Sequence, residues 1–134
     1  MTVSYLSIGS NLGDRHQNIK SAIKKIKSLK GTHILKISRI IETEPVGGPA
    51  GQKRFLNACL KIDTKFSPRS LLHKLEIIER QLGRKNTVRW GARTMDLDIL
   101  FYGNKVIRQK DLTIPHKRLF KRDFVLEPLS EIIW

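Results

Sequence analysis

Apolar residues recur along this chain with two different periods, and each change of period marks the end of an element. Alternating or β-branched runs predict strands, whereas apolar residues three and four positions apart predict helices. Strands are predicted over residues 3–8, 34–43, 54–63 and 95–101, and helices over residues 15–30 and 68–82. This order is the ferredoxin-like β-α-β-β-α-β pattern. We therefore expect an α+β fold, an antiparallel sheet with helices packed on it, in a single domain of residues 1–134.

Both predicted helices carry recognisable start and stop signals. Asp14 can accept a hydrogen bond from the first turn of the first helix, and Gly31 can follow its end. Ser67 and Pro68 are a typical N-cap and first-turn residue for the second helix, which Gly83 can stop. These signals support the helices independently of the apolar spacing.

Charge and composition restrict the partners of the protein. The 134 residues include 26 Lys and Arg against 12 Asp and Glu, a net charge of +14. Such a charge attracts nucleic acid, nucleotides or anionic lipid, although the lysine run in the first helix is typical of a solvated face. No apolar run approaches the ~18 residues of a membrane span, and the N-terminus lacks a charged leader before an apolar segment. We expect no membrane partner and, because Cys59 is the only cysteine, a cytoplasmic location.

Two acidic residues stand two positions apart in the last predicted strand, next to a basic part of the chain. Alternation sends Leu97, Ile99 and Phe101 to one face of this strand and Asp96 and Asp98 to the other. Two carboxylates ~6.6 Å apart repel by about 2–3 kcal/mol in an environment of intermediate dielectric constant. A positive charge is therefore expected between them.

Two kinds of positive charge could meet this carboxylate pair. One is a surface ion pair with Arg89 or Arg93, from the basic stretch before the strand. The other is a hard divalent cation, which takes oxygen ligands and lets the carboxylates carry substrate phosphates. Phosphoryl transfer mainly needs positioning and neutralisation of charge, which arginines and divalent ions supply.

An aromatic ring and an amide share one face of the third predicted strand. Phe55 and Asn57 lie on the side away from its apolar face. This pair is compatible with recognition of a planar polar ligand, and equally with ordinary cross-strand packing. Together with the acids and the basic stretch, it indicates a phosphoryl-transfer site.

Two other classes of protein share parts of this pattern. A basic ferredoxin-like sheet is also the plan of an RNA-recognition module. That module needs a pattern of exposed aromatic residues that this sequence lacks, and two acids on the same face would repel a phosphate chain. A D-x-D pair also occurs in sugar-nucleotide transferases, which generally need a larger fold than 134 residues allow. We therefore expect no nucleic-acid partner.

Five stretches of the sequence resemble one known family, in the order of that family: IGSNLGDR, TEPVGG, FLNA, RWGARTMDLDILFYG and IPHKRLFKRDFVLEPL. The family is the 6-hydroxymethyl-7,8-dihydropterin pyrophosphokinases of folate biosynthesis. The resemblance implies a ferredoxin-like core that transfers the terminal diphosphate of ATP to the pterin hydroxymethyl oxygen and leaves AMP. We expect a monomer that acts on these two small molecules.

The resemblance also implies roles for individual residues. Asp96 and Asp98 would bind two Mg²⁺ ions that bridge the ATP phosphates, and Arg84 and Arg93 would stabilise charge on the transferred group. The pterin would be bound by Thr43, Glu44, Val46, Phe55, Asn57, Trp90 and Phe124, and ATP by Glu79, Arg89, Ile99, Thr113, His116 and Arg122. Most of these positions lie in or next to the last strand, in the basic stretch before it, or in the loop after residue 43.

Overall fold

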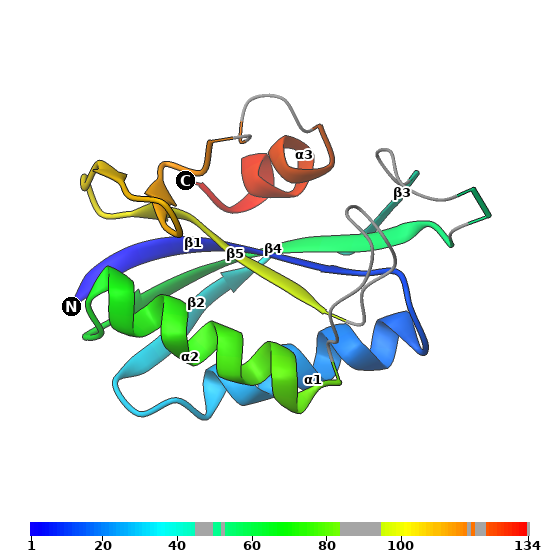
Figure 1. Ribbon diagram of the computed structural model, residues 1–134, viewed down its shortest axis with the longest axis horizontal. Helices are drawn as coiled ribbons and strands as arrows, with labels where there is room; N and C mark the ends of the chain where they lie inside the picture. Colours follow the sequence, from blue (N-terminus) through cyan, green and yellow to red (C-terminus); the bar gives the residue numbers. More distant parts are fainter. Residues whose placement is uncertain (45–49, 52, 84–94, 118, 120–122, 134) are drawn as a thin grey trace.

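The computed structural model describes residues 1–44, 50–51, 53–83, 95–117, 119 and 123–133. Within this part of the chain, five strands form one antiparallel sheet, two short strands form a hairpin, and three helices pack around them (Figure 1). In chain order the elements are β1 (Thr2–Ser10), α1 (Arg15–Lys27), β2 (Thr32–Ile37), β3 (Ile41–Thr43), β4 (Phe55–Thr64), α2 (Pro68–Gln81), β5 (Asp96–Tyr102), β6 (Ile107–Arg108), β7 (Thr113–Ile114) and α3 (Asp123–Ile132).

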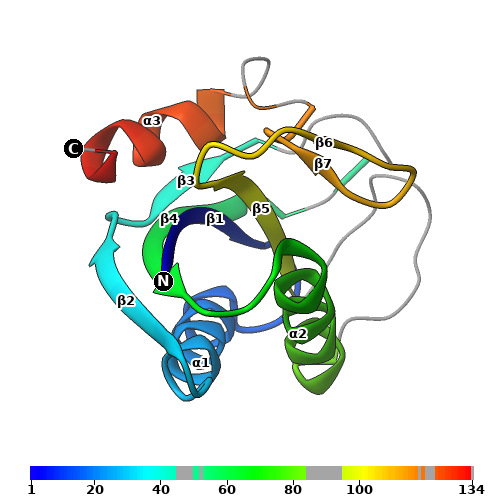
Figure 2. The same ribbon diagram turned by 90° about the vertical axis from the view of Figure 1, so that its left-hand side faces the viewer.

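The main sheet has the strand order β2-β4-β1-β5, and β3 also pairs with β4. All of these pairs are antiparallel, with β1 and β4 in the centre. Helices α1 and α2 cover one face of the sheet, while α3 lies on the other (Figures 1 and 2). The ferredoxin-like α+β fold expected from the order of elements is confirmed, and α3 is an addition to it.

The second predicted strand is divided into two. β2 ends at Ile37 and β3 begins at Ile41. Ser38 stays attached to β4, because its N–H donates to the Cys59 carbonyl at 2.9 Å and its Oγ accepts from the Cys59 N–H at 2.8 Å. After this interruption β3 pairs with β4 up to Thr43, which lies opposite Phe55, the first residue of β4.

The predicted starts of both helices are confirmed. Asp14 Oδ1 accepts from the Gln17 N–H at 3.1 Å, and Ser67 Oγ accepts from the Ser70 N–H at 3.2 Å. The end of α1 comes earlier than predicted, and Gly31 instead takes a φ of 80° in the turn to β2. An N-cap stabilises a helix by about 1 kcal/mol, so both helices are anchored locally as well as by packing.

The main core lies between the sheet and helices α1 and α2. Its side chains come from alternate positions of the strands and from one stripe of each helix. Fully buried members include Leu6, Ile8, Leu60 and Ile62 from the strands and Ile19, Ile26, Leu71 and Leu75 from the helices. Burial of a side chain of this size contributes about 1.5–3 kcal/mol, so the core fixes which face of each strand is left for other uses.

The last strand departs from simple alternation at one residue. In its pairing with β1 the register shifts, and Leu100 has no opposite partner. Leu97 and Ile99 face the main core as predicted, but Phe101 lies on the opposite face, where its ring meets Tyr5 edge-on at 6.1 Å. The prediction for Phe101 is wrong because an extra residue in one strand reverses the alternation that follows it.

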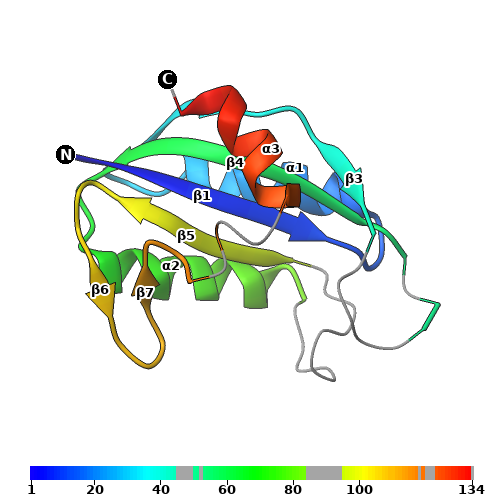
Figure 3. The same cartoon turned by 90° about the horizontal axis from the view of Figure 1, so that it is seen from above.

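A second core lies on the opposite face of the sheet, under α3 (Figure 3). Its buried members are Cys59, Leu100, Leu119, Val125, Leu129 and Ile132. The Cys59 thiol donates to the Val125 carbonyl at 3.7 Å, and burial, assisted by the charge of Glu131, raises its pKa to about 12. This thiol is therefore a core residue and is protonated at neutral pH.

No helix was predicted after the last predicted strand, whereas the structure forms α3 there. The apolar spacing from Val125 to Ile132 is helical, but Pro128 interrupts it and lacks the N–H that a helix interior uses. The structure places Pro128 within α3, where its neighbours pack on the sheet. Burial of these neighbours outweighs the lost hydrogen bond.

Candidate active site

Three predicted site residues meet at one end of the sheet, on the face that α3 partly covers. Gly9 of β1 is paired with Asn57 of β4 on one side and with Asp96 of β5 on the other. Two residues along β1, the partner of Asp98 is Ser7. Directly opposed residues of neighbouring strands point to the same face, so the amide and both carboxylates share a surface.

Gly9 forms the floor between the amide and the carboxylates. A Cβ atom at this position would lie 3.1 Å from Asn57 Oδ1 and 3.5 Å from Phe55 Cδ1. The first distance is tighter than an ordinary van der Waals contact, so glycine permits the close approach. Any larger side chain would enter the space between Asn57 and Asp96.

The amide side of the site is joined to β3. Asn57 is 7% exposed, and its Nδ2 donates to Thr43 Oγ1 at 2.7 Å. Phe55 is half-buried and is paired directly with Thr43. The structure thus brings together three of the residues that the resemblance assigns to the pterin.

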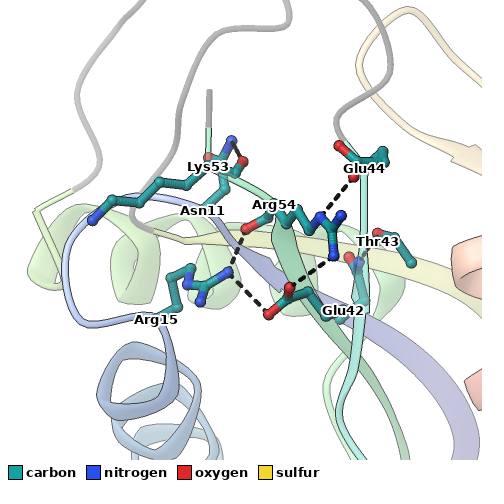
Figure 4. Close-up of polar contacts among 8 residues, drawn as sticks. Asn11, Arg15, Glu42, Thr43, Glu44, Lys53 and Arg54 are labelled. Atoms are coloured by element: carbon teal, nitrogen blue, oxygen red, sulfur yellow. Dashed lines mark hydrogen bonds and ion pairs between the residues drawn. The ribbon is translucent and has the colours of Figure 1, made fainter. Parts of the chain in front are cut away.

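Four charged side chains link the start of α1, the end of β3 and the residue before β4, and we name them the β3–β4 clamp: Arg15, Glu42, Glu44 and Arg54 (Figure 4). Glu42 lies within 3.5 Å of a guanidinium nitrogen of Arg15 and of Arg54. Arg54 Nε contacts Glu44 Oε1 at 2.6 Å, and Arg15 donates to the Arg54 carbonyl at 2.8 Å. Ion pairs this exposed contribute about 0.2–1 kcal/mol each, so the clamp depends on their combination.

The carboxylate side of the site borders a cavity of about 140 Å³. Its lining includes Asp98, Ile99, Thr113 and His116, which come from β5, from β7 and from the segment after β7. His116 Nε2 lies 3.8 Å from Asp98 Oδ1. These are four residues that the resemblance assigns to ATP and its metal ions, and the fold places them around one space.

The β6–β7 hairpin forms one wall of this cavity and lies beside β5 in Figure 3. Arg69, in the first turn of α2, contacts Asp111 Oδ2 at 2.5 Å and also donates to Gln109. The hydrogen bond from Arg69 lowers the pKa of Asp111. This contact attaches the hairpin to α2, and no sequence signal pointed to it because the partners are 40 or more residues apart.

Glu79 approaches β5 from the helix layer. Its side chain is buried, and Oε2 accepts a hydrogen bond from the Leu97 N–H at 2.8 Å. Leu97 is the residue between the two acids of the site. Sequence reasoning could not find this contact, because its partner is a backbone group 18 residues away.

The two acids suit a divalent cation that arrives with phosphate. Asp96 and Asp98 offer hard oxygen donors, and both are only partly buried. Among the described residues, no group of three or more His, Cys, Asp or Glu could hold a metal ion. Mg²⁺ is commonly held by one or two carboxylates together with substrate phosphates and water, so the pair fits this ion.

Several predicted site residues lie outside the described part of the chain. They are Val46, Arg84, Arg89, Trp90, Arg93 and Arg122, and the side chain of Phe124 is not described either. Their assignments stay predictions.

In the residues that are described, no helix is long and apolar enough to cross a membrane.

The fold and this end of the sheet define a class: a ferredoxin-like α+β protein with a carboxylate pair beside a cavity, as phosphoryl transfer requires. Residues 5–134 match the model of the 7,8-dihydro-6-hydroxymethylpterin-pyrophosphokinase (HPPK) family. The chain belongs to this family, as its sequence stretches predicted.

Curated relatives agree with this membership. The chain is 43% identical over 132 residues to a 2-amino-4-hydroxy-6-hydroxymethyldihydropteridine pyrophosphokinase of Haemophilus influenzae, covering 98% of this chain and 82% of the relative. It is 42% identical over 130 residues to the Bacillus subtilis protein of that name, covering 97% and 77%. It also matches 24% of a mitochondrial folate synthesis bifunctional protein of Pisum sativum, at 42% identity over 96% of this chain.

A solved structure agrees with the fold. An HPPK-DHPS crystal structure in complex with substrates superposes with a TM-score of 0.73 over 98% of this chain and 40% of that chain. Sequence identity is 15%, so this likeness bears on the fold alone.

Proposed function

We propose that this protein transfers diphosphate from ATP to the hydroxymethyl group of 6-hydroxymethyl-7,8-dihydropterin, giving AMP and the pterin diphosphate in folate biosynthesis. Family membership supports this reaction. The structural observation that carries it is the row Asn57–Gly9–Asp96 across three strands. Two strand spacings of about 4.8 Å separate the amide from the first carboxylate, a span suited to a bicyclic ring and its hydroxymethyl arm.

Around the pterin, Asn57 would hydrogen-bond the edge of the ring, and Phe55 would stack on its face. Both already border the floor at Gly9. Thr43 supports the amide through its hydroxyl group. The other residues proposed for this substrate are Glu44, Val46, Trp90 and Phe124.

Asp96 and Asp98 would hold two Mg²⁺ ions. The bound ions would neutralise the ATP phosphates and align them with the hydroxymethyl oxygen. Arg84 and Arg93 would stabilise charge on the transferred group. Ile99, Thr113 and His116 would line the nucleotide site, and Arg89 and Arg122 would also bind ATP; the resemblance adds Glu79 to this set.

We also propose a cytoplasmic monomer without a nucleic-acid partner. Sedimentation of the protein at several concentrations would test the monomer. A gel shift with random single-stranded RNA would test the alternative that the +14 charge serves nucleic acid. RNA binding that survives Asp96→Ala would favour that alternative.

The decisive experiment mixes the protein with ATP, Mg²⁺ and the hydroxymethyl pterin and separates the nucleotide products. We expect AMP, formed only when the pterin is present. ADP as the product would contradict diphosphate transfer, and AMP formed without the pterin would contradict the acceptor. Omitting Mg²⁺, with chelator present, tests the metal requirement separately.

A further inference from the structure

Glu79 is the only charged side chain that is buried among the residues that the structure describes, with 6% of its surface exposed. It belongs to the last turns of α2, and its Oε2 accepts from the Leu97 N–H at 2.8 Å. A buried carboxylate is costly unless hydrogen bonds compensate it. An apolar residue of similar size would fill the same space without that cost, so the acid points to a role beyond packing.

The hydrogen bond to Glu79 falls between the two carboxylates of the site. In the described sheet, β5 is the last strand on its side. Successive residues of a strand direct their backbone groups to opposite edges. Leu97 therefore directs its N–H outward, and Asp96 and Asp98 direct theirs toward β1. Glu79 therefore accepts a hydrogen bond from the outer edge of β5, whereas β1 pairs with its inner edge.

The same outer edge borders the cavity. The His116 N–H donates to the Leu100 carbonyl at 3.1 Å, so contacts from the chain attach this edge at Leu97 and again at Leu100. Ile99 lies between these two points and lines the cavity. The placement of Asp98 and Ile99 relative to the cavity is thus fixed on both sides of them.

We propose that Glu79 is a positioning residue, which acts through the Leu97 N–H to hold Asp96 and Asp98 in the arrangement that diphosphate transfer needs. The inference rests on the proposed function and refines one part of it. The resemblance implies that Glu79 contacts ATP, whereas this contact requires an acceptor oxygen and no negative charge. Without it, a buried N–H would be unpaired at the start of an edge strand whose carboxylates repel each other.

Two conservative variants separate the acceptor from the charge. Glu79→Gln keeps the side-chain length and an acceptor oxygen but removes the charge. Glu79→Asp keeps the charge but is one methylene shorter, so its oxygens withdraw from the Leu97 N–H. Glu127→Gln and Glu127→Asp make the same changes at an exposed position of α3 and serve as matched controls.

The first readout needs no substrate. Amide hydrogen exchange of Leu97, measured by NMR, reports the hydrogen bond directly. We expect Glu79→Gln to retain the protection of this amide and Glu79→Asp to lose it, while Leu60 in the main core stays protected in both. Faster exchange of both amides would reveal general destabilisation.

The second readout is function. We expect Glu79→Asp to lose about 10- to 100-fold in kcat, since small misplacements of catalytic groups have effects of this size, and Glu79→Gln to lose clearly less than Glu79→Asp. The affinity for Mn²⁺ in the presence of a non-hydrolysable ATP analogue, measured by electron paramagnetic resonance, should follow the same order.

The reverse order, with Glu79→Gln the weaker enzyme and Leu97 still protected, would overturn the inference in favour of a charge that acts on the nucleotide. Equal activity of the two variants would overturn it as well. Failure of the proposed function looks different, because the natural protein itself would then form no pterin-dependent AMP. In that case the exchange measurement would still test whether Glu79 holds the strand.

Discussion

The amide side and the carboxylate side of the candidate active site are held in place in different ways. On the carboxylate side, the buried Glu79 side chain accepts a hydrogen bond from the Leu97 N–H. On the amide side, the β3–β4 clamp joins the end of β3 to the residue before β4 through four charged side chains with 25–70% exposure. Buried contacts are little affected by salt, whereas exposed ion pairs are weak and screened. The difference favours a fixed frame for the groups proposed to hold phosphate and an adaptable border for the proposed pterin site.

The largest effect should come from the fixed side. We expect Asp96→Asn and Asp98→Asn each to reduce pterin-dependent AMP formation by at least about 10²- to 10³-fold, because each removes a charge that is proposed to hold the phosphates, through Mg²⁺, in the transition state. Both residues are partly exposed, so circular dichroism and thermal unfolding should change little. Asp63→Asn, at the other end of β4, is the control and should keep normal turnover. Near-normal turnover in both site variants would remove the metal assignment.

A substitution of Gly9 tests whether the amide side and the carboxylate side of the site act together across β1. Gly9→Val would add a branched side chain where even a Cβ lies 3.1 Å from Asn57 Oδ1. We expect the KM for the pterin to rise about tenfold or more, with Gly9→Ala intermediate, because the blocked space adjoins the amide. Binding of an ATP analogue should change less, as measured by calorimetry. A larger loss of nucleotide affinity than of pterin affinity would contradict this division of the site.

Much of this architecture could be predicted because it depends on local patterns. Alternation placed Asn57 on one face of its strand and both acids on one face of theirs, and the caps at Asp14 and Ser67 marked helix starts. Pairing of the strands through Gly9 then brings these side chains onto one surface. The spacing of apolar residues and the helix caps predict the fold correctly, because the main core buries the same faces of the strands and helices that this spacing indicates.

The remaining features depend on contacts without a local signature. The extra residue at Leu100 leaves the apolar pattern of β5 unchanged, although it moves Phe101 to the other face. Pro128 interrupts the helical spacing of apolar residues, so the sequence did not indicate α3, which depends on packing against the sheet. The hydrogen bond that Glu79 accepts comes from a backbone N–H, a group that every residue except proline possesses.

The adaptable side should show a smaller, salt-dependent effect. Glu42→Gln removes the acid that contacts both Arg15 and Arg54. We expect the KM for the pterin to rise about two- to fivefold at low salt, the size that exposed ion pairs allow, while kcat stays close to normal. High salt should bring the variant and the natural protein together, because it screens the same pairs. Glu127→Gln, which removes an exposed carboxylate from α3, is the control.

The smallest effect should come from the exposed contact that holds the β6–β7 hairpin. The hydrogen bond from Arg69 lowers the pKa of Asp111. The contact between Arg69 and Asp111 is therefore fully formed at a pH above the ordinary pKa of an aspartate, and it is lost as the pH falls through the lowered pKa of Asp111. We expect Arg69→Gln to raise the KM for ATP about twofold at neutral pH, since the pair is exposed but adjoins the cavity. The KM for the pterin should not change, because Asn57 and Thr43 lie on the other side of β1. Equal changes in both constants would show that the two sides of the site are coupled through more than the central strand.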